Sequence, residues 1–367
     1  MSIDAKRRLV IEYAHSGAGA MKMATNPAQG ITQQSQDRMQ SVDIVRAVAI
    51  ICVVLGHALI FAKCGTFLMI SIYSFHMALM FALSGFVTAA SWERSGEDGL
   101  RLARSKVSRS ARRLLVPYAI CGIAVMPLGN FLLSGNFAES FITVWRDAFL
   151  INRFLWYLPC CFFLVCIFAA VALVTRRTDG IRWLVGVCVA FALVVAAHLL
   201  VPAVDYSRSV MNYFAAFFAG AWLWARRDAI LHPGRRLLAC ASIAFVALAV
   251  AFPLMPEIPL VGKNIVKPVA GIAALFPLMA LTGKIKGPAA SGMALVGRTT
   301  LFLYCFDFFA TPLSVRFLKP TGVLPTLATA IFVVALGTFI NLAWEYAILP
   351  KIKKPCRTCR TGRGRGV

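Results

Sequence analysis

The stretch 41–61 reads SVDIVRAVAIICVVLGHALIF, and it decides the fold. Between Arg46 and His57 it runs through ten residues without a charge. The stretch has the length of a helix that crosses a bilayer, which takes about 20 residues. Ionisable side chains inside such a helix cost roughly 2.5–3.5 kcal/mol each on insertion scales, so they are candidates for function. The stretch therefore predicts a membrane helix that carries chemistry.

Similar apolar stretches follow along the whole chain. Of its 367 residues, 59% are hydrophobic and only 14% are charged, with a mean hydropathy of +0.75. A soluble domain carries about 25% charged residues, so this composition excludes an ordinary soluble enzyme and a disordered polar chain. We predict an all-α, polytopic transmembrane helical bundle of about ten spans, with both termini cytoplasmic. The expected spans are 42–61, 67–90, 114–133, 154–174, 183–201, 209–225, 237–254, 265–283, 299–316 and 325–349.

The basic residues predict the orientation of these spans. Lys and Arg number 38 against 15 Asp and Glu, which gives a formal net charge of +23. With a cytoplasmic N-terminus, 29 of the 38 fall on the cytoplasmic side and eight on the opposite side, while Arg46 lies inside the first span. This bias follows the positive-inside rule and predicts a multi-pass protein with both ends in the cytoplasm. Since the basic residues are spread over loops and not interleaved with aromatic ones, we expect contact with membrane lipids and no nucleic-acid partner.

The two ends of the chain are polar. Residues 1–41 lack the apolar core of a signal peptide, and we expect a flexible cytoplasmic N-terminal tail there. The membrane domain is expected over 42–349, followed by a basic cytoplasmic C-terminal tail over 350–367. Cys356 and Cys359 form a C-x-x-C in that tail without a second Cys or His pair nearby, so we predict no metal site.

One face of the first span carries three ionisable residues. Asp43 and Arg46 are three residues apart and share a face. His57 lies eleven residues beyond Arg46, nearly on the same face and about 16 Å deeper. The face thus offers a cation near the cytoplasm and an imidazole in the outer half of the membrane. A snorkelling arginine and a packed histidine would also explain this pattern.

The second span strengthens the functional interpretation. It runs back inward and places His76 at a depth similar to that of His57, because the hairpin between the two spans is short. Two imidazoles at one level of the membrane favour chemistry over packing. Nearer the cytoplasm, Ser84 and Gly85 form a step of small residues. Either a ligand approaches closely there or a neighbouring helix packs there.

These motifs resemble a known family. Arg46-x10-His57 preceded by Asp43, together with Phe75-His76-Met77 and Ser84-Gly85-Phe86, resembles the acyltransferase-3 family of integral-membrane O-acyltransferases. Its members are ten-helix proteins that O-acylate cell-surface sugars with a cytoplasmic acyl-CoA. The stretch 155–159, Leu-Trp-Tyr-Leu-Pro, is similar to the Trp-Phe-Leu element of the family.

The sequence departs from the family pattern at two positions. Ala78 stands where the family commonly has Pro, and Asp307 stands where many members have His. Asp307 is either a buried carboxylate that needs a His or Arg partner, or a residue of the membrane interface.

The resemblance implies roles for particular residues. The catalytic residues would be His57, His76 and Asp43, with His57 as the base for the acceptor hydroxyl. His76 would orient His57, act as a second base or relay a proton. Arg46 would hold the nucleotide end of acetyl-CoA, since about 16 Å is on the order of a pantetheine arm. The cofactor-binding residues would be Arg46, Ser84, Gly85, Arg112 and Arg113.

The outer mouth of the fourth span is the expected acceptor site. Arg153, Trp156 and Tyr157 lie there as substrate-binding candidates. The aromatic residues serve either as interfacial anchors or as a platform on which a sugar stacks.

The resemblance predicts a membrane O-acetyltransferase. It would move an acetyl group from acetyl-CoA to a sugar hydroxyl of a surface or exopolysaccharide precursor, as bacterial polysaccharide acetylases do. The acceptor would be a lipid-linked oligosaccharide or a polysaccharide. The alternative is a polytopic transporter or flippase for a polysaccharide intermediate, since intramembrane His, Asp and Arg also mark proton-coupled carriers.

Overall fold

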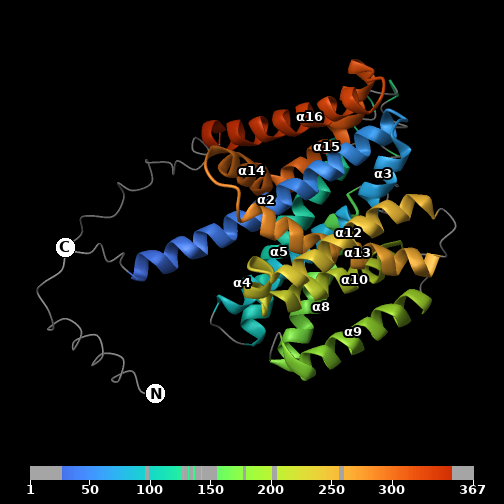
Figure 1. Ribbon diagram of the computed structural model, residues 1–367. Helices are drawn as coiled ribbons and strands as arrows, with labels where there is room; N and C mark the ends of the chain where they lie inside the picture. Colours follow the sequence, from blue (N-terminus) through green and yellow to red (C-terminus); the bar gives the residue numbers. More distant parts are fainter. Residues whose placement is uncertain are drawn as a thin grey trace, which may run out of the picture. The chain divides into compact units, whose positions relative to one another are not determined.

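The computed structural model describes residues 27–348, except 96–98, 126, 128–130, 132–134, 137–141, 143–154, 177–178, 201–204 and 256–259. Every regular element in these residues is a helix (Figure 1), which confirms the all-α class. The first helix, α2 (Pro27–Phe61), begins inside the segment predicted as a tail. The helices described below belong to the compact unit that begins at Arg38.

The remaining helices match the predicted series of spans only in part, because Arg227–Leu231, Pro288–Arg298 and most of Leu100–Ile120 fall between predicted spans. They are α3 (Thr66–Tyr73), α4 (His76–Glu93), α5 (Leu100–Ile120) with a π-helical turn Cys121–Val125, α8 (Tyr157–Thr175), α9 (Gly180–Leu200), α10 (Asp205–Trp224), α11 (Arg227–Leu231), α12 (Arg235–Leu254), α13 (Leu260–Thr282), α14 (Pro288–Arg298), α15 (Thr300–Leu318), and α16 (Val323–Ala343) with a π-helical turn Trp344–Ile348.

Eight helical segments within the described residues are long and apolar enough to cross a membrane, which confirms a polytopic bundle. The predicted span 114–133 falls partly outside the described residues. The predicted span 209–225 lies in α10, which is not among the eight. The number of ten spans and the cytoplasmic side of the termini stay predictions.

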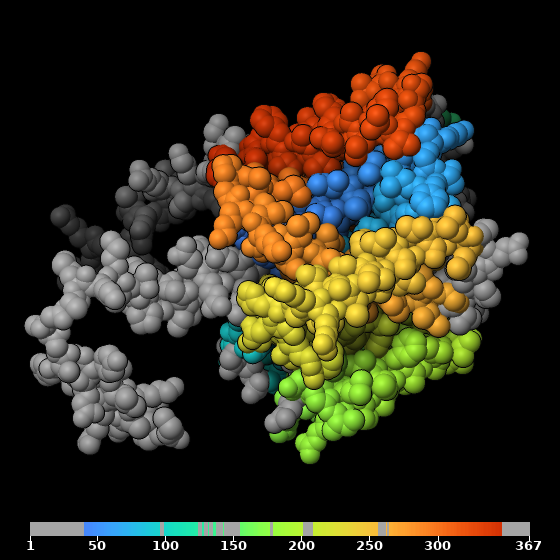
Figure 2. All heavy atoms as spheres, viewed as in Figure 1, coloured from blue at the N-terminus to red at the C-terminus, as the bar shows by residue number. Residues whose placement is uncertain are grey.

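Helices at the centre of this unit differ from those at its edge. α4 is buried along most of its length and packs against α8, α10 and α13. By contrast, α9 and α12 bury almost nothing, and Figure 2 shows them as the green and yellow helices on the visible surface. Their outward side chains are apolar, as a lipid-facing surface requires.

The central helices approach one another through small residues. A Cβ on Gly85 would overlap the backbone carbonyl of Phe217, and one on Gly220 of α10 would overlap the carbonyl of Ala82. Such small residues allow two membrane helices to pack backbone against backbone. Of the two interpretations of Gly85, this contact favours helix packing, and its role as a cofactor-binding residue stays a prediction.

The second predicted span, 67–90, is kinked. It consists of α3 and α4, which are separated at Phe75 (φ −135°, ψ −32°), and together they form one apolar stretch, Thr66–Glu93, that is long enough to cross a membrane. Two side chains take up carbonyls that a continuous helix would use: Ser74 Oγ donates to Ser71 O at 2.7 Å, and His76 Nδ1 bonds Ile72 O at 2.7 Å. The break makes His76 the first residue of α4.

Candidate active site

The central finding of the site is a pair formed by His57 and Asp307. Asp307 on α15 is fully buried, and its Oδ2 accepts a hydrogen bond from His57 Nδ1. Its other oxygen accepts from the hydroxyl of Thr311, one turn further along α15. Because the carboxylate holds the Nδ1 proton, the Nε2 atom of His57 keeps a lone pair. This is the arrangement that prepares an imidazole to act as a general base.

His76 is held in the same tautomer by a different partner. A carbonyl oxygen only accepts, so the 2.7 Å contact with Ile72 O means that Nδ1 of His76 carries its proton. Its Nε2 is then also a lone-pair acceptor. His57 and His76 line one cavity of about 80 Å³. The structure thus brings the two imidazoles together. The group that orients His57 by a hydrogen bond is Asp307, not His76.

The walls of this histidine cavity are aromatic. Trp156 stacks on Tyr213 with ring centroids 5.2 Å apart, and Tyr73 meets His76 edge-on at 4.8 Å. Trp156 therefore faces the cavity, which favours the platform over the interfacial anchor. Arg153, the charged member of the predicted acceptor site, lies outside the described residues.

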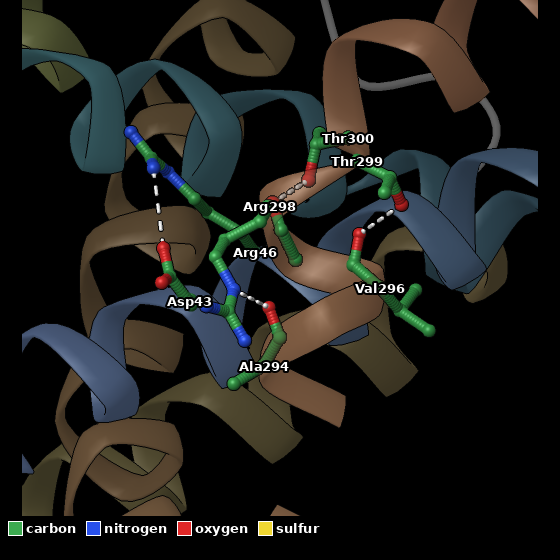
Figure 3. Close-up of polar contacts among 8 residues, drawn as sticks. Asp43, Arg46, Ala294, Val296, Arg298, Thr299 and Thr300 are labelled. Atoms are coloured by element: carbon green, nitrogen blue, oxygen red, sulfur yellow. Dashed lines mark hydrogen bonds and ion pairs between the residues drawn. The ribbon is translucent and has the colours of Figure 1, made fainter. Parts of the chain in front are cut away.

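A second cavity of about 120 Å³ is lined by Arg46, Arg113 and Arg298. Arg46 Nη1 lies 3.4 Å from Asp43 Oδ1. Figure 3 shows the Asp43 carboxylate between the side chains of Arg46 and Arg298, and Nε of Arg298 donates to Ala294 O at 3.3 Å. Asp43 was predicted to be catalytic; it forms an ion pair with Arg46 and is not among the residues that line the histidine cavity, so its catalytic role stays a prediction.

Ser84 and Tyr157 also line this arginine cavity, and the Ser84 Oγ and Tyr157 OH atoms are 2.7 Å apart. Tyr157, predicted at the acceptor site, thus lines the same cavity as the predicted donor-binding residues Arg46 and Ser84, and its role in binding substrate stays a prediction. Arg112 is exposed on α5 and does not line the cavity, whereas its neighbour Arg113 does.

Tyr304 of α15 connects the two cavities, since it lines both. Its ring meets that of Tyr157 at 5.4 Å and that of Phe308 at 5.8 Å. Phe308 in turn contacts His57 at 5.1 Å. A ligand that extends from the arginines to His57 would therefore pass Tyr157 and Tyr304.

Three charged residues of the site were not predicted as site residues. Asp307 gave a signal, a carboxylate in an apolar span, but its partner is 250 residues away in the sequence. Lys267 lines the histidine cavity and falls within the predicted span 265–283, but its position near the end of that span gave no sign of its neighbours. Arg298 gave no signal beyond its charge.

The comparisons with known proteins agree with this geometry. A family model described as an acyltransferase domain, that of acyltransferase-3, matches residues 39–348. The matched range contains every residue that lines the two cavities. No curated protein and no solved structure matches the chain.

Proposed function

The chain belongs to the acyltransferase-3 family and is a multi-pass membrane acyltransferase, and we propose that it transfers acetyl from cytoplasmic acetyl-CoA to a sugar hydroxyl. The acceptor is a surface or exopolysaccharide precursor, met in the inner membrane as a lipid-linked oligosaccharide. The observation that carries the proposal is the His57–Asp307 pair in a cavity that adjoins three arginines.

The arginine cavity suits the phosphates of the donor. Guanidinium groups bind phosphate oxygens in a bidentate way, and three of them line this cavity. Its volume of about 120 Å³ is below the roughly 300–1,000 Å³ of a pocket for a whole ligand, so it takes the diphosphate and not the entire nucleotide. The rise along α2 separates Arg46 from His57 by about 16 Å, on the order of a pantetheine arm. The thioester then lies beside His57.

The histidine cavity suits the transfer step. His57 Nε2 takes the proton of the acceptor hydroxyl while the oxygen attacks the thioester carbon. The tetrahedral intermediate expels the CoA thiolate, which receives the proton from the imidazolium and leaves as the thiol. Asp307 stabilises the imidazolium in between, and general base catalysis of this kind contributes about 10²–10⁴-fold. Trp156 and Tyr213 offer the sugar an aromatic face.

The test is transfer of label by the purified full chain in proteoliposomes. The substrates are acetyl-CoA with a radiolabelled acetyl group and lipid-linked saccharides extracted from cells that naturally make this protein. We expect label in the extracted saccharides, and a loss of at least about 100-fold in His57→Ala. CoA binding should be unchanged in that variant, because the arginine cavity is intact.

His232→Ala is the matched control, since His232 is exposed at the end of α11 and far in sequence from either cavity. It should transfer label at the wild-type rate. A fully active His57→Ala protein would contradict the proposed mechanism. A wild type that moves the saccharide across the membrane without acetylating it would favour the transporter.

A further inference from the structure

Acyl transfer requires stabilisation of the oxyanion in the tetrahedral intermediate. Neither imidazole of the histidine cavity can supply a donor while it is neutral. His57 gives its Nδ1 proton to Asp307, and His76 gives its Nδ1 proton to Ile72 O. Both Nε2 atoms are acceptors, so the donor for the oxyanion is another group that lines the cavity, and Lys267 is the one among the described lining residues that carries a positive charge.

Lys267 is held at this cavity by the packing of α13 on α4. Gly271, four residues beyond Lys267, lies on the same face of α13. A Cβ on Gly271 would meet Ala78 Cβ at 2.5 Å and Leu79 N at 2.7 Å, so the two helices are in direct contact there. One turn before Gly271 on α13, Lys267 lines the cavity together with both imidazoles, including that of His76 at the start of α4.

The ammonium of Lys267 sits in mostly aromatic surroundings. Its Nζ atom is 5.8 Å from the centroid of the Phe252 ring, within the range of a cation–π contact. Lys267 is the fourth residue of the apolar span Asn264–Thr282, and an ionisable side chain inside such a span is a candidate for function.

The size of the cavity indicates which part of the substrates Lys267 meets. A volume of about 80 Å³ is well below that of a pocket for a whole ligand, roughly 300–1,000 Å³. The groups that share it with His57 are therefore the thioester carbonyl and the acceptor hydroxyl, not a remote part of the acceptor.

We propose that the Lys267 ammonium stabilises the oxyanion of the tetrahedral intermediate, an inference that rests on the proposed acyltransferase function. As the acceptor oxygen bonds to the carbonyl carbon, the π electrons of the carbonyl move to its oxygen, and the negative charge forms beside Lys267. When the carbonyl re-forms, the carbon–sulfur bond breaks with its electron pair on sulfur. The thiolate takes the proton held by His57, and Lys267 keeps all its protons throughout.

The test compares Lys267→Met and Lys267→Arg in the transfer assay. Methionine keeps the unbranched apolar stem and removes the charge, so we expect kcat to fall about 100-fold, as for the loss of one oxyanion donor. KM for acetyl-CoA and for the lipid-linked saccharide should stay within about threefold, and so should the Kd of CoA itself. Arginine restores the charge and should recover part of kcat.

Lys319→Met is the control, because Lys319 is exposed at the end of α15. A rise in KM for the saccharide with unchanged kcat would overturn the proposal and assign Lys267 to an acidic group of the acceptor. An equally active Lys267→Met protein would overturn it as well. A lower kcat accompanied by weakened CoA binding would instead indicate a merely structural role. If the wild type fails to acetylate the saccharide, the proposed acyltransferase function itself is contradicted. This outcome is distinct from every outcome for Lys267→Met in an active enzyme.

Discussion

The arginine cavity and the histidine cavity are neighbours that share Tyr304, yet their charges are of different kinds. The arginine cavity carries guanidinium groups, which remain charged at every physiological pH. Asp43 lies among them with its side chain 14% exposed. The histidine cavity carries imidazoles beside Asp307, a carboxylate with no exposed surface. Fixed charge suits binding, and a group that gains and loses a proton suits reaction.

From this difference we infer that the two acidic residues, Asp43 and Asp307, have separate functions. Asp43 neutralises part of a cationic site that must still attract an anion. Asp307 fixes the tautomer of His57 and is itself held by the hydroxyl of Thr311. Substitutions in the histidine cavity should therefore change kcat, and those in the arginine cavity should change KM for the donor.

The largest effect is expected for Asp307→Asn. The amide keeps the shape of the carboxylate but loses the charge that stabilises the imidazolium, so kcat should fall by about 10²–10⁴-fold. KM for acetyl-CoA should be unchanged. The measurement is steady-state transfer of label with varied acetyl-CoA.

Two further variants accompany this prediction: Thr311→Val is the weaker variant, and Asp228→Asn is the control. Valine removes only the hydroxyl that donates to Asp307, and a hydrogen bond to a charged group is worth about 1.5–3 kcal/mol. The loss in kcat should therefore be smaller than that of Asp307→Asn. Asp228 is exposed at the start of α11, and its amide variant should behave as the wild type. If Asp307→Asn changed only the KM for acetyl-CoA and left kcat unchanged, the assignment of binding to one cavity and reaction to the other would be contradicted.

A smaller effect is expected for Arg46→Gln. Glutamine loses the charge that attracts the phosphates, so KM for acetyl-CoA should rise about 10–100-fold, the equivalent of a charged hydrogen bond. The turnover number should change little, because His57 and Asp307 are untouched. Titration of the protein with CoA provides the affinity without catalysis.

Arg235→Gln is the matched control, since Arg235 is exposed at the start of α12. It removes one basic residue from the same predicted side of the membrane. If both variants weaken CoA binding equally, the attraction comes from the overall charge of that side. In that case the arginine cavity is not the donor site.

The arrangement of the first span was predictable because it depends on the geometry of one helix. The spacing of Asp43 and Arg46 determined that they share a face, and the structure pairs them at 3.4 Å. The hairpin to the second span is also local, so the meeting of His57 with His76 followed from sequence. Apolar stretches of bilayer length likewise predicted the all-α polytopic class.

What could not be predicted depends on contacts between distant helices. The partner of His57 lies 250 residues away, and no rule of spacing links α2 to α15. Gly85 needed the position of Phe217 before its packing role was visible. The break before His76 arises from side-chain bonds to carbonyls, which compete with the helix in a way that hydropathy does not register.

The smallest effect is expected for Tyr157→Phe. The measurement decides whether Tyr157 acts in the donor site or in the acceptor site. The hydroxyl lies 2.7 Å from Ser84 Oγ, and one neutral hydrogen bond is worth about 0.5–1.5 kcal/mol. If Tyr157 belongs to the arginine cavity, KM for acetyl-CoA should rise about two- to tenfold while KM for the saccharide stays constant. Ser84→Ala removes the other half of the same bond, so the double variant should be no worse than the more affected single one. A rise in KM for the saccharide alone would return Tyr157 to the acceptor site that its sequence position suggested.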